Sequence, residues 1–176
     1  MADRLPHRVS RALATSSIER IDVITSLSFT ELIDAFESSL GRWEPHVGDA
    51  LVRDQVSWQE AKISIGAMAG PRGLMIFSKI NQGEIASLAG TPRSSVIYLV
   101  GNPLIATTIL QVDIRAGMLV PFRVELYEDG QGGILSYDAP SSFLGSLDNP
   151  ALTEIGKALD EKMSGVAAEL TSRPGS

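Results

Sequence analysis

Three polar side chains, Arg123, Glu125 and Tyr127, alternate with apolar ones along one segment of the chain. Successive side chains of a β-strand point to opposite faces, so these three would share one face at a spacing of about 7 Å. Tyr137 and Asp138 stand in the segment expected to pair with this strand. On such a surface the guanidinium of Arg123 could bind an anionic substrate while Glu125 and Asp138 exchange protons with that substrate. A solvated sheet face with cross-strand ion pairs has the same pattern, so catalysis by the two carboxylates is one of two interpretations.

A second candidate is the turn Gly101-Asn102-Pro103, which follows an apolar run and precedes a helix-like segment. The first N–H groups of a helix have no partner within the helix, and glycine allows a close approach. The turn could therefore bind a carboxylate or a phosphate. Alternatively, Asn102 only caps the helix, because Gly-Asn-Pro is a much looser signal than a complete phosphate-binding loop. Both interpretations predict a helix that begins at Pro103.

Histidine and cysteine offer little material for a metal or nucleophilic site. The chain has 2 His, His7 and His46, and 0 Cys. The lack of cysteine excludes Cys-ligated metals, disulfides and thiolate nucleophiles. His46, close to Trp43 in the sequence, could act as a single haem ligand or a general base, although an exposed loop histidine is the simpler interpretation. No other metal ligand is predicted, and the sequence leaves the cofactor unknown.

The composition limits the binding partners and the cellular compartment that are expected for the protein. The 176 residues carry 15 Lys and Arg against 21 Asp and Glu, which gives a net charge of −6. An acidic chain is a poor counterion for phosphate backbones, so nucleic acid is not an expected partner. No apolar run reaches the roughly 18 residues of a membrane helix, and the N-terminus lacks the apolar core of a secretory signal. A cytoplasmic protein without a membrane partner is expected.

Periodicity and capping signals predict the elements that must position these residues. Ser28 with Glu31, and Ser57 with Glu60, form capping boxes ahead of helical apolar spacing. The expected helices are 29–40, 58–69, 83–89, 103–112 and 150–171. The expected strands are 18–25, 74–81, 95–101, 120–127 and 134–138. Residues 95–101 are nearly all apolar, which indicates a central strand covered on both faces. Residues 42–56 are expected to form a long loop or a short irregular helix.

The order of these elements favours an α+β fold, because an antiparallel hairpin at 120–138 breaks the alternation that a doubly wound sheet requires. We expect one two-layer domain with helices packed on a small mixed or antiparallel sheet of about five strands. It would span residues 18–171, between a flexible N-terminal arm at 1–17 and a frayed tail at 172–176. The hydrophobic fraction of 44% suffices for a compact core.

Residues 65–163 resemble, in order, the family known as Domain of Unknown Function 302. The resemblance rests on four segments: 73–80, 98–105, 121–127 and 136–142. Its most specific parts are the Gly-Asn-Pro turn and the Tyr-Asp-x-Pro segment that begins at Tyr137. The resemblance implies a compact α+β domain that pairs as a homodimer, and it implies no activity. Family members often carry Asp-His where this chain has Asn81 and Gln82, so any role of that pair as base or ligand is missing here.

Three functions are compatible with these residues. The first is a module that binds or senses a small molecule. The guanidinium of Arg123 and the Gly101-Asn102-Pro103 turn indicate an anionic or carboxylated ligand. The second is a small cofactor-free enzyme with acid/base carboxylates, such as an isomerase, cyclase or hydrolase. The third is a haem-binding or structural protein-interaction domain. The residues predicted to bind the ligand are Gly101, Asn102, Tyr98, Arg123, Tyr127 and Tyr137.

Overall fold

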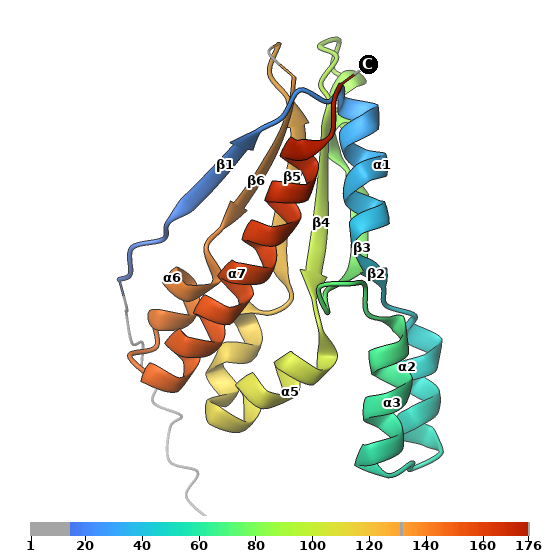
Figure 1. Cartoon of the computed structure of the whole chain (residues 1–176), viewed down its shortest axis with the longest axis vertical. Helices are drawn as coiled ribbons and strands as arrows, with labels where there is room; N and C mark the ends of the chain where they lie inside the picture. Colours follow the sequence, from blue (N-terminus) through green and yellow to red (C-terminus); the bar gives the residue numbers. More distant parts are fainter. Residues whose placement is uncertain (1–14, 131, 176) are drawn as a thin grey trace, which may run out of the picture.

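The computed structural model describes residues 15–130 and 132–175 (Figure 1). The strands are β1 (Arg20–Ile24), β2 (Gly41–Arg42), β3 (Met75–Asn81), β4 (Ser95–Gly101), β5 (Phe122–Glu128) and β6 (Gly133–Asp138). The helices are α1 (Phe29–Ser39), α2 (Pro45–Arg53), α3 (Trp58–Met68), α4 (Gln82–Ser87), α5 (Pro103–Val112), the 3₁₀ helix η1 (Ile114–Leu119), α6 (Pro140–Gly145) and α7 (Pro150–Ser172). The chain is a single α+β domain, as the sequence predicts.

The strands form one six-stranded sheet in the order β1-β6-β5-β4-β3-β2. β2 runs parallel to β3, and the other neighbouring pairs are antiparallel. The sheet is therefore mixed, and β1 and β2 are its two edges. The sequence predicts about five strands because β2 has only two residues, which pair with Met75 and Ile76. A segment of that length cannot show the alternation by which strands are recognised.

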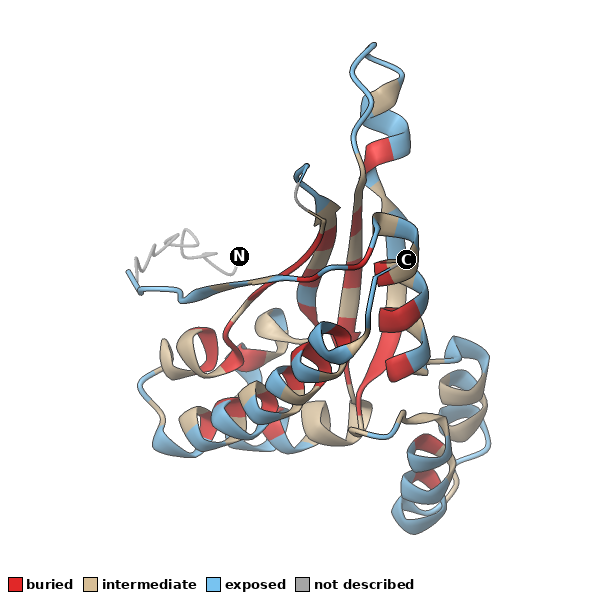
Figure 2. Cartoon of the chain, turned by 45° about the horizontal axis from the view of Figure 1, so that its top comes forward, coloured by how far each residue is buried: buried red, intermediate tan, exposed pale blue. Residues whose placement is uncertain are grey.

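The two faces of the sheet differ in what covers them. α1 and α7 lie across one face, with α5 and α6 toward one end of it (Figure 1). Buried residues alternate with less buried ones along β4 and β5 (Figure 2). The buried ones face these helices, and alternation places their neighbours on the other side. In β4 the residues Val96, Tyr98 and Val100 are buried, whereas Ser95, Ile97 and Leu99 are only partly buried. We call the second side, which carries Asp22 and Glu125, the open face.

The core lies between the covered face and the helices. Phe36 from α1 and Met163 from α7 are fully buried against strand residues such as Val124 and Leu135. The apolar stripe predicted for the last helix is confirmed, because Leu152, Leu159, Met163, Val166 and Leu170 are buried. Burial of this kind provides most of the stability of the domain.

Local signals in the sequence set most helix starts. Ser28 and Ser57 accept hydrogen bonds from the backbone N–H groups of Glu31 and Glu60, and both capping boxes are complete. Asn149 caps α7 in the same way, by accepting from the N–H of Ala151. These side chains satisfy N–H groups that lack a partner within the helix, so the predicted helix starts are confirmed.

Three predictions of secondary structure need correction or refinement. Residues 45–53 form α2, which agrees with the short helix expected as one alternative for residues 42–56 and not with the long loop; the helix is regular, and Pro45 stands in its first turn, where proline is tolerated. β4 is not covered on both faces, because Ser95, Ile97 and Leu99 point to the open face and stay partly exposed. The short helices η1 and α6 were not expected, since six residues are too few to establish a period.

The ends of the chain are described only in part. Residues 1–14 lie outside the described residues, and with them most of the expected arm 1–17, including His7. At the other end α7 continues to Ser172, and the guanidinium of Arg173 donates to Glu169. None of the helices among residues 15–130 and 132–175 is long and apolar enough to cross a membrane.

Candidate functional site

Strand pairing lines up polar side chains across the open face. The register places Asp22 opposite Ser136 and Ser136 opposite Glu125. One step along the strands, Arg20 pairs with Asp138. Directly paired residues project from the same face of a sheet, so these residues from β1, β6 and β5 form two adjacent rows. Arg20 and Asp22 of β1 stand more than 100 residues before their neighbours on β5 and β6 in the chain.

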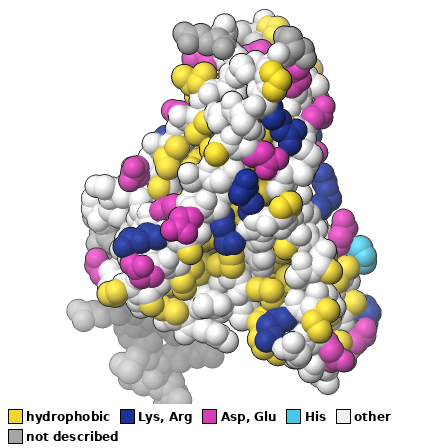
Figure 3. All heavy atoms as spheres, in the orientation of Figure 1, with side chains coloured by type: hydrophobic (Ala, Val, Ile, Leu, Met, Phe, Trp, Pro, Cys, Tyr) yellow, Lys and Arg dark blue, Asp and Glu magenta, His cyan; other side chains and the backbone are white. Residues whose placement is uncertain are grey.

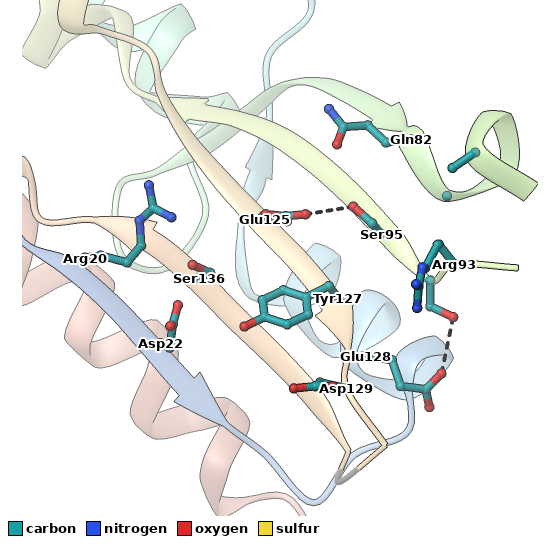
Figure 4. Close-up of a pocket in the computed structure, with 13 residues that line it drawn as sticks. Arg20, Asp22, Gln82, Arg93, Ser95, Glu125, Tyr127, Glu128, Asp129 and Ser136 are labelled. Atoms are coloured by element: carbon teal, nitrogen blue, oxygen red, sulfur yellow. Dashed lines mark hydrogen bonds between the residues drawn. The ribbon is translucent and has the colours of Figure 1, made fainter. Parts of the chain in front are cut away.

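A cavity of about 510 Å³ lies over these rows and extends to α4 (Figure 4). A smaller one of about 110 Å³ adjoins it and shares Arg20, Glu125 and Ser136 with it. We call the two together the open-face groove. The larger cavity is lined by Arg20, Asp22, Gln82, Gly83, Ala86, Arg93, Ser94, Ser95, Glu125, Tyr127, Glu128, Asp129 and Ser136. The smaller one adds Ile97, Arg123, Tyr137 and Asp138.

Glu125 stands where the two cavities meet. Its carboxylate accepts a hydrogen bond of 2.8 Å from the hydroxyl of Ser95, and the side chain is partly buried (Figure 4). Arg123, Glu125 and Tyr127 share one face of β5, while Phe122, Val124 and Leu126 are buried on the other. The predicted alternation of this strand is therefore confirmed. Only one carboxylate oxygen of Glu125 is engaged by Ser95, which leaves the other able to contact a molecule in the groove.

Arg20 and Asp138 form an ion pair at one end of the groove. Arg20 Nε donates to Asp138 Oδ1 at 2.5 Å. This hydrogen bond and the charge of Asp138 raise the pKa of Arg20, and the nearby charges of Asp22 and Glu125 act in the same direction. The charge of Asp138 is thus paired with Arg20, whereas Glu125 makes no ion pair with any described residue. Of the two predicted carboxylates, Glu125 is therefore the better placed for acid/base chemistry.

Two guanidinium groups of the groove are free to bind an anion. Arg93 lines the larger cavity and Arg123 the smaller one. Neither side chain makes an ion pair or a hydrogen bond with any residue that the structure describes. Carboxylates nevertheless outnumber guanidiniums in the larger cavity, where Asp22, Glu125, Glu128 and Asp129 face Arg20 and Arg93. The groove therefore suits a molecule with both an anionic group and hydrogen-bond donors.

Tyr127 adds a phenol to the wall of the larger cavity (Figure 4). Partial burial raises its pKa, and the negative charges of Asp22, Asp129 and Glu125 raise it further. The hydroxyl therefore stays protonated at neutral pH. It can donate a hydrogen bond to a bound molecule.

Tyr98 and Tyr137, both predicted to bind the ligand, belong to the opposite side of the sheet. Tyr98 is fully buried, and its hydroxyl donates to Glu37 Oε1 at 2.7 Å. Burial raises the pKa of Tyr98 and the hydrogen bond to Glu37 adds to the effect. Tyr137 borders the smaller cavity, but its side chain lies in the core cluster. An odd number of positions separates each tyrosine from the open-face residues of its strand, so its ring points away from them.

Gly101 and Asn102 lie apart from the open-face groove. Asn102 Oδ1 accepts from the N–H of Leu104 at 2.8 Å, and its Nδ2 donates to the carbonyl of Gly73 at 2.8 Å. Both ends of this side chain are thus used inside the protein, and Asn102 caps α5 as predicted. The turn borders a separate cavity of about 270 Å³ beside α5. The predicted ligand residues therefore divide among the open-face groove, the core and this cavity.

The residues described in the structure offer no metal centre. No group of three or more His, Cys, Asp or Glu side chains within residues 15–130 and 132–175 is arranged to hold a metal ion. His46, the candidate haem ligand, is exposed on α2, where its Nδ1 lies 3.7 Å from Glu44. The open-face groove contains no histidine.

Sequence reasoning missed several residues of the groove. Arg20 and Asp22 alternate with Ile21 and Val23 in the sequence, a signal that marks them as outward-facing but not as neighbours of Glu125. Their position follows from the pairing of β1 with β6, which no local pattern predicts. The missed residues include Arg20, Asp22, Gln82, Arg93, Ser95 and Ser136.

Comparisons with known proteins give a family and a fold. The family model described as "Domain of unknown function DUF302" matches residues 51–170. Among solved structures, the chain is similar to the "uncharacterized conserved protein DUF302 from Bacillus stearothermophilus", with a TM-score of 0.62 and 17% sequence identity. That match covers 86% of this chain and 97% of the other, and at such low identity it shows the shared fold alone. No curated protein matches the chain.

Proposed function

The chain belongs to the DUF302 family, whose description assigns no activity, and from the geometry we propose that it binds a small polar molecule in the open-face groove. One observation carries the proposal: polar side chains from β1, β6, β5, β4 and α4, most of them charged or hydroxyl-bearing, converge on a single cavity. A volume of about 510 Å³ lies within the range of small-molecule sites.

The free guanidiniums define one part of the ligand. Arg93 and Arg123 have no partner among the described side chains, so an anionic group of the ligand can pair with either without displacing an existing contact. Arginine binds carboxylate and phosphate oxygens through two parallel hydrogen bonds. This supports the expectation of an anionic or carboxylated ligand.

The carboxylates of the open-face groove define the other part of the ligand. Asp22, Glu125 and Asp129 accept hydrogen bonds and repel a ligand that is anionic throughout. The ligand that fits carries hydroxyl or amino groups in addition to its anionic end. Tyr127 and Ser136 can accept or donate further hydrogen bonds from the sheet. A small hydroxylated or amino-substituted carboxylic acid has this combination.

A pair of tryptophan substitutions tests the site. Ala86 lines the larger cavity and is exposed on α4, whereas Ala89, three residues later, is exposed and lies outside the lining. Ala86→Trp should fill the cavity, while Ala89→Trp should leave it open. The measurement is native mass spectrometry of protein purified from its own host, read for a bound small molecule. We expect an adduct on the wild type and on Ala89→Trp that is absent from Ala86→Trp. An adduct that persists on Ala86→Trp, or a clean mass for the wild type, contradicts the proposal.

Acid/base catalysis is a second candidate, and the position of Glu125 favours it. This carboxylate is partly buried, borders both cavities and has one oxygen free of Ser95. Glu125→Gln should then abolish turnover of a molecule that the groove binds while the melting temperature changes by only a few degrees. Turnover that survives this substitution removes Glu125 from the chemistry.

The homodimer implied by the family resemblance is proposed on separate grounds. Ile80 and Ile97 pair across β3 and β4 on the open face, and Ile80 is exposed. Apolar side chains on an uncovered sheet face support contact with a second copy. Sedimentation equilibrium of the wild type should give twice the chain mass of 18.8 kDa. A variant with Ile80→Lys should shift that equilibrium toward the monomer.

A further inference from the structure

A second groove lies in the helical hairpin at the opposite edge of the sheet from β1. It has a volume of about 590 Å³ and is lined by Trp43, Pro45, Gly48, Asp49, Leu51, Val52, Gln55, Val56, Trp58, Ala61 and Ile65. These residues come from α2, α3 and the segments beside them. We call it the hairpin groove. It shares no lining residue with the open-face groove.

Part of the apolar lining of this groove is poorly covered by the rest of the protein, whereas Ala61 and Ile65 are buried. Val52 is 80% exposed and Trp58 is 50% exposed. α2 contains no buried residue, and its N-cap Glu44 makes no side-chain capping bond. A nine-residue helix is marginal in water without tertiary packing, so α2 would gain from any group that covers its apolar side. Hydrophobic side chains reach the surface over this hairpin in Figure 3.

Aromatic rings give the groove its shape. The chain has 2 Trp, and both line the cavity. Trp43 is held in place by stacking on Phe77, with ring centroids 5.7 Å apart and planes at 26°. It also lies against Gly48, where an added Cβ would come within 2.5 Å of the indole ring. The absence of a side chain at Gly48 therefore lets the indole of Trp43 form part of the wall.

The charge of the groove is negative. Asp49 is the single charged residue of its lining, and its carboxylate makes no hydrogen bond or ion pair with any described residue. The neighbouring Asp54, in contrast, is paired with Arg53 at 3.0 Å. A carboxylate beside two indole rings attracts cations, because aromatic faces also carry negative potential.

We propose that the hairpin groove binds a small aromatic cation, with its rings between Trp43 and Trp58 and its charge near Asp49. The aromatic part replaces the missing cover on α2, and the positive charge pairs with the free carboxylate. A neutral or anionic molecule of the same shape fits the apolar walls but gains nothing from Asp49. A preference for the cation therefore distinguishes a specific site from non-specific binding to an apolar surface.

Nuclear magnetic resonance detects binding at the hairpin groove directly. Each tryptophan gives one indole N–H signal, so the two signals of the chain both report on the groove. The probe is 1-naphthylmethylammonium, compared with 1-naphthaleneacetate, which has the same rings and the opposite charge. We expect saturable shifts of both indole signals with the cation, at a dissociation constant several-fold lower than that of the anion. Equal affinity for the two probes, or indole signals that do not move with the cation, overturns the proposal.

Matched variants test the charge. Asp49→Asn removes the free carboxylate, whereas Asp54→Asn removes a paired one on the same hairpin. Attraction between unit charges near a protein surface predicts roughly fivefold weaker cation binding for Asp49→Asn. Asp54→Asn should leave the affinity unchanged. An equal loss in both variants would mean that only the net charge of the hairpin matters, and would contradict a specific contact.

A third variant tests the place of binding. Val52→Arg introduces a like charge at an exposed position of the wall and should abolish binding of the cation. Because Val52 is largely exposed, the fold should tolerate this change, which the remaining amide signals will show. Undiminished cation binding to folded Val52→Arg overturns the proposal.

Discussion

Replacing Tyr98 by Phe tests whether this tyrosine serves the core and not a ligand. Its hydroxyl donates to Glu37 Oε1 at 2.7 Å, and its ring packs on Phe36 with centroids 5.0 Å apart. Lys79 Nζ also donates to the same carboxylate oxygen, at 2.6 Å. The substitution removes one hydrogen bond and leaves the ring in place. It therefore measures the contribution of the hydroxyl to stability separately from the packing of the ring.

The structure sets the expected magnitude. A hydrogen bond to a charged group contributes about 1.5 to 3 kcal/mol to stability. The lower end applies here, because Glu37 keeps Lys79 and its side chain is 24% exposed, so water can replace the lost donor. We expect the free energy of unfolding to fall by about 1.5 kcal/mol. For a domain of this size, that corresponds to a decrease of about 3 to 6 °C in melting temperature.

Urea unfolding followed by circular dichroism measures the change, with the slope m expected to stay constant. Tyr127→Phe is the control, because the hydroxyl of Tyr127 on the open face makes no hydrogen bond with any described residue. Its effect should stay within about 0.5 kcal/mol. Equal stability losses in the two variants, or none in Tyr98→Phe, would refute the reasoning. A ligand of the open-face groove should bind to Tyr98→Phe as it does to the wild type.

Four further substitutions follow from the surroundings of individual residues. Asn102→Ala should lower stability by about 1 to 2 kcal/mol in urea unfolding, because it removes a helix cap and the bond to Gly73. Gly66→Ala should raise the melting temperature, since a Cβ there meets nothing within 4 Å, whereas Gly156→Ala should lower it, since its Cβ would lie 2.5 Å from the backbone of α6. Burial acts to raise the pKa of Glu37, but hydrogen bonds from Lys79 and Tyr98 outweigh it and lower the pKa below 4.5. The stability that Glu37 contributes is therefore present above pH 4.5 and lost as the pH falls through its folded pKa, and unfolding of Glu37→Gln should depend less on pH in that range.

The sequence predicts elements whose signals are local. The capping boxes at Ser28 and Ser57 and the alternation of residues 120–127 each involve neighbours in the chain, and all three are confirmed. The exposure of β4 could not be predicted in the same way. Ile97 and Leu99 are apolar in the sequence yet lie on the open face. A strand covered on both faces and one with apolar residues on an open face give the same run of letters.

The candidate site depends on contacts that are distant in the chain. Glu125 and Tyr127 could be placed on one face, because a single strand carries both. Asp22 joins them only through two successive strand pairings, and Arg93 only through the turn between α4 and β4. Tyr137 shows the reverse case, in which a neighbour in the sequence is not a neighbour on the face of the sheet. It stands next to Asp138 in the sequence, and for that reason it points to the other side of the sheet.

The two proposed grooves can be tested independently, because the fold separates them. The open-face groove spans β1 to β4, and the hairpin groove lies beyond the edge formed by β2. They share no lining residue, and the sheet between them is continuous. Effects of substitutions at such separated sites normally add, unless a switch between two conformations connects them. Loss of binding at one groove therefore says nothing about the other. Only a variant such as Ala86→Trp that changed cation affinity at Trp58 would show that this sheet transmits a conformational change.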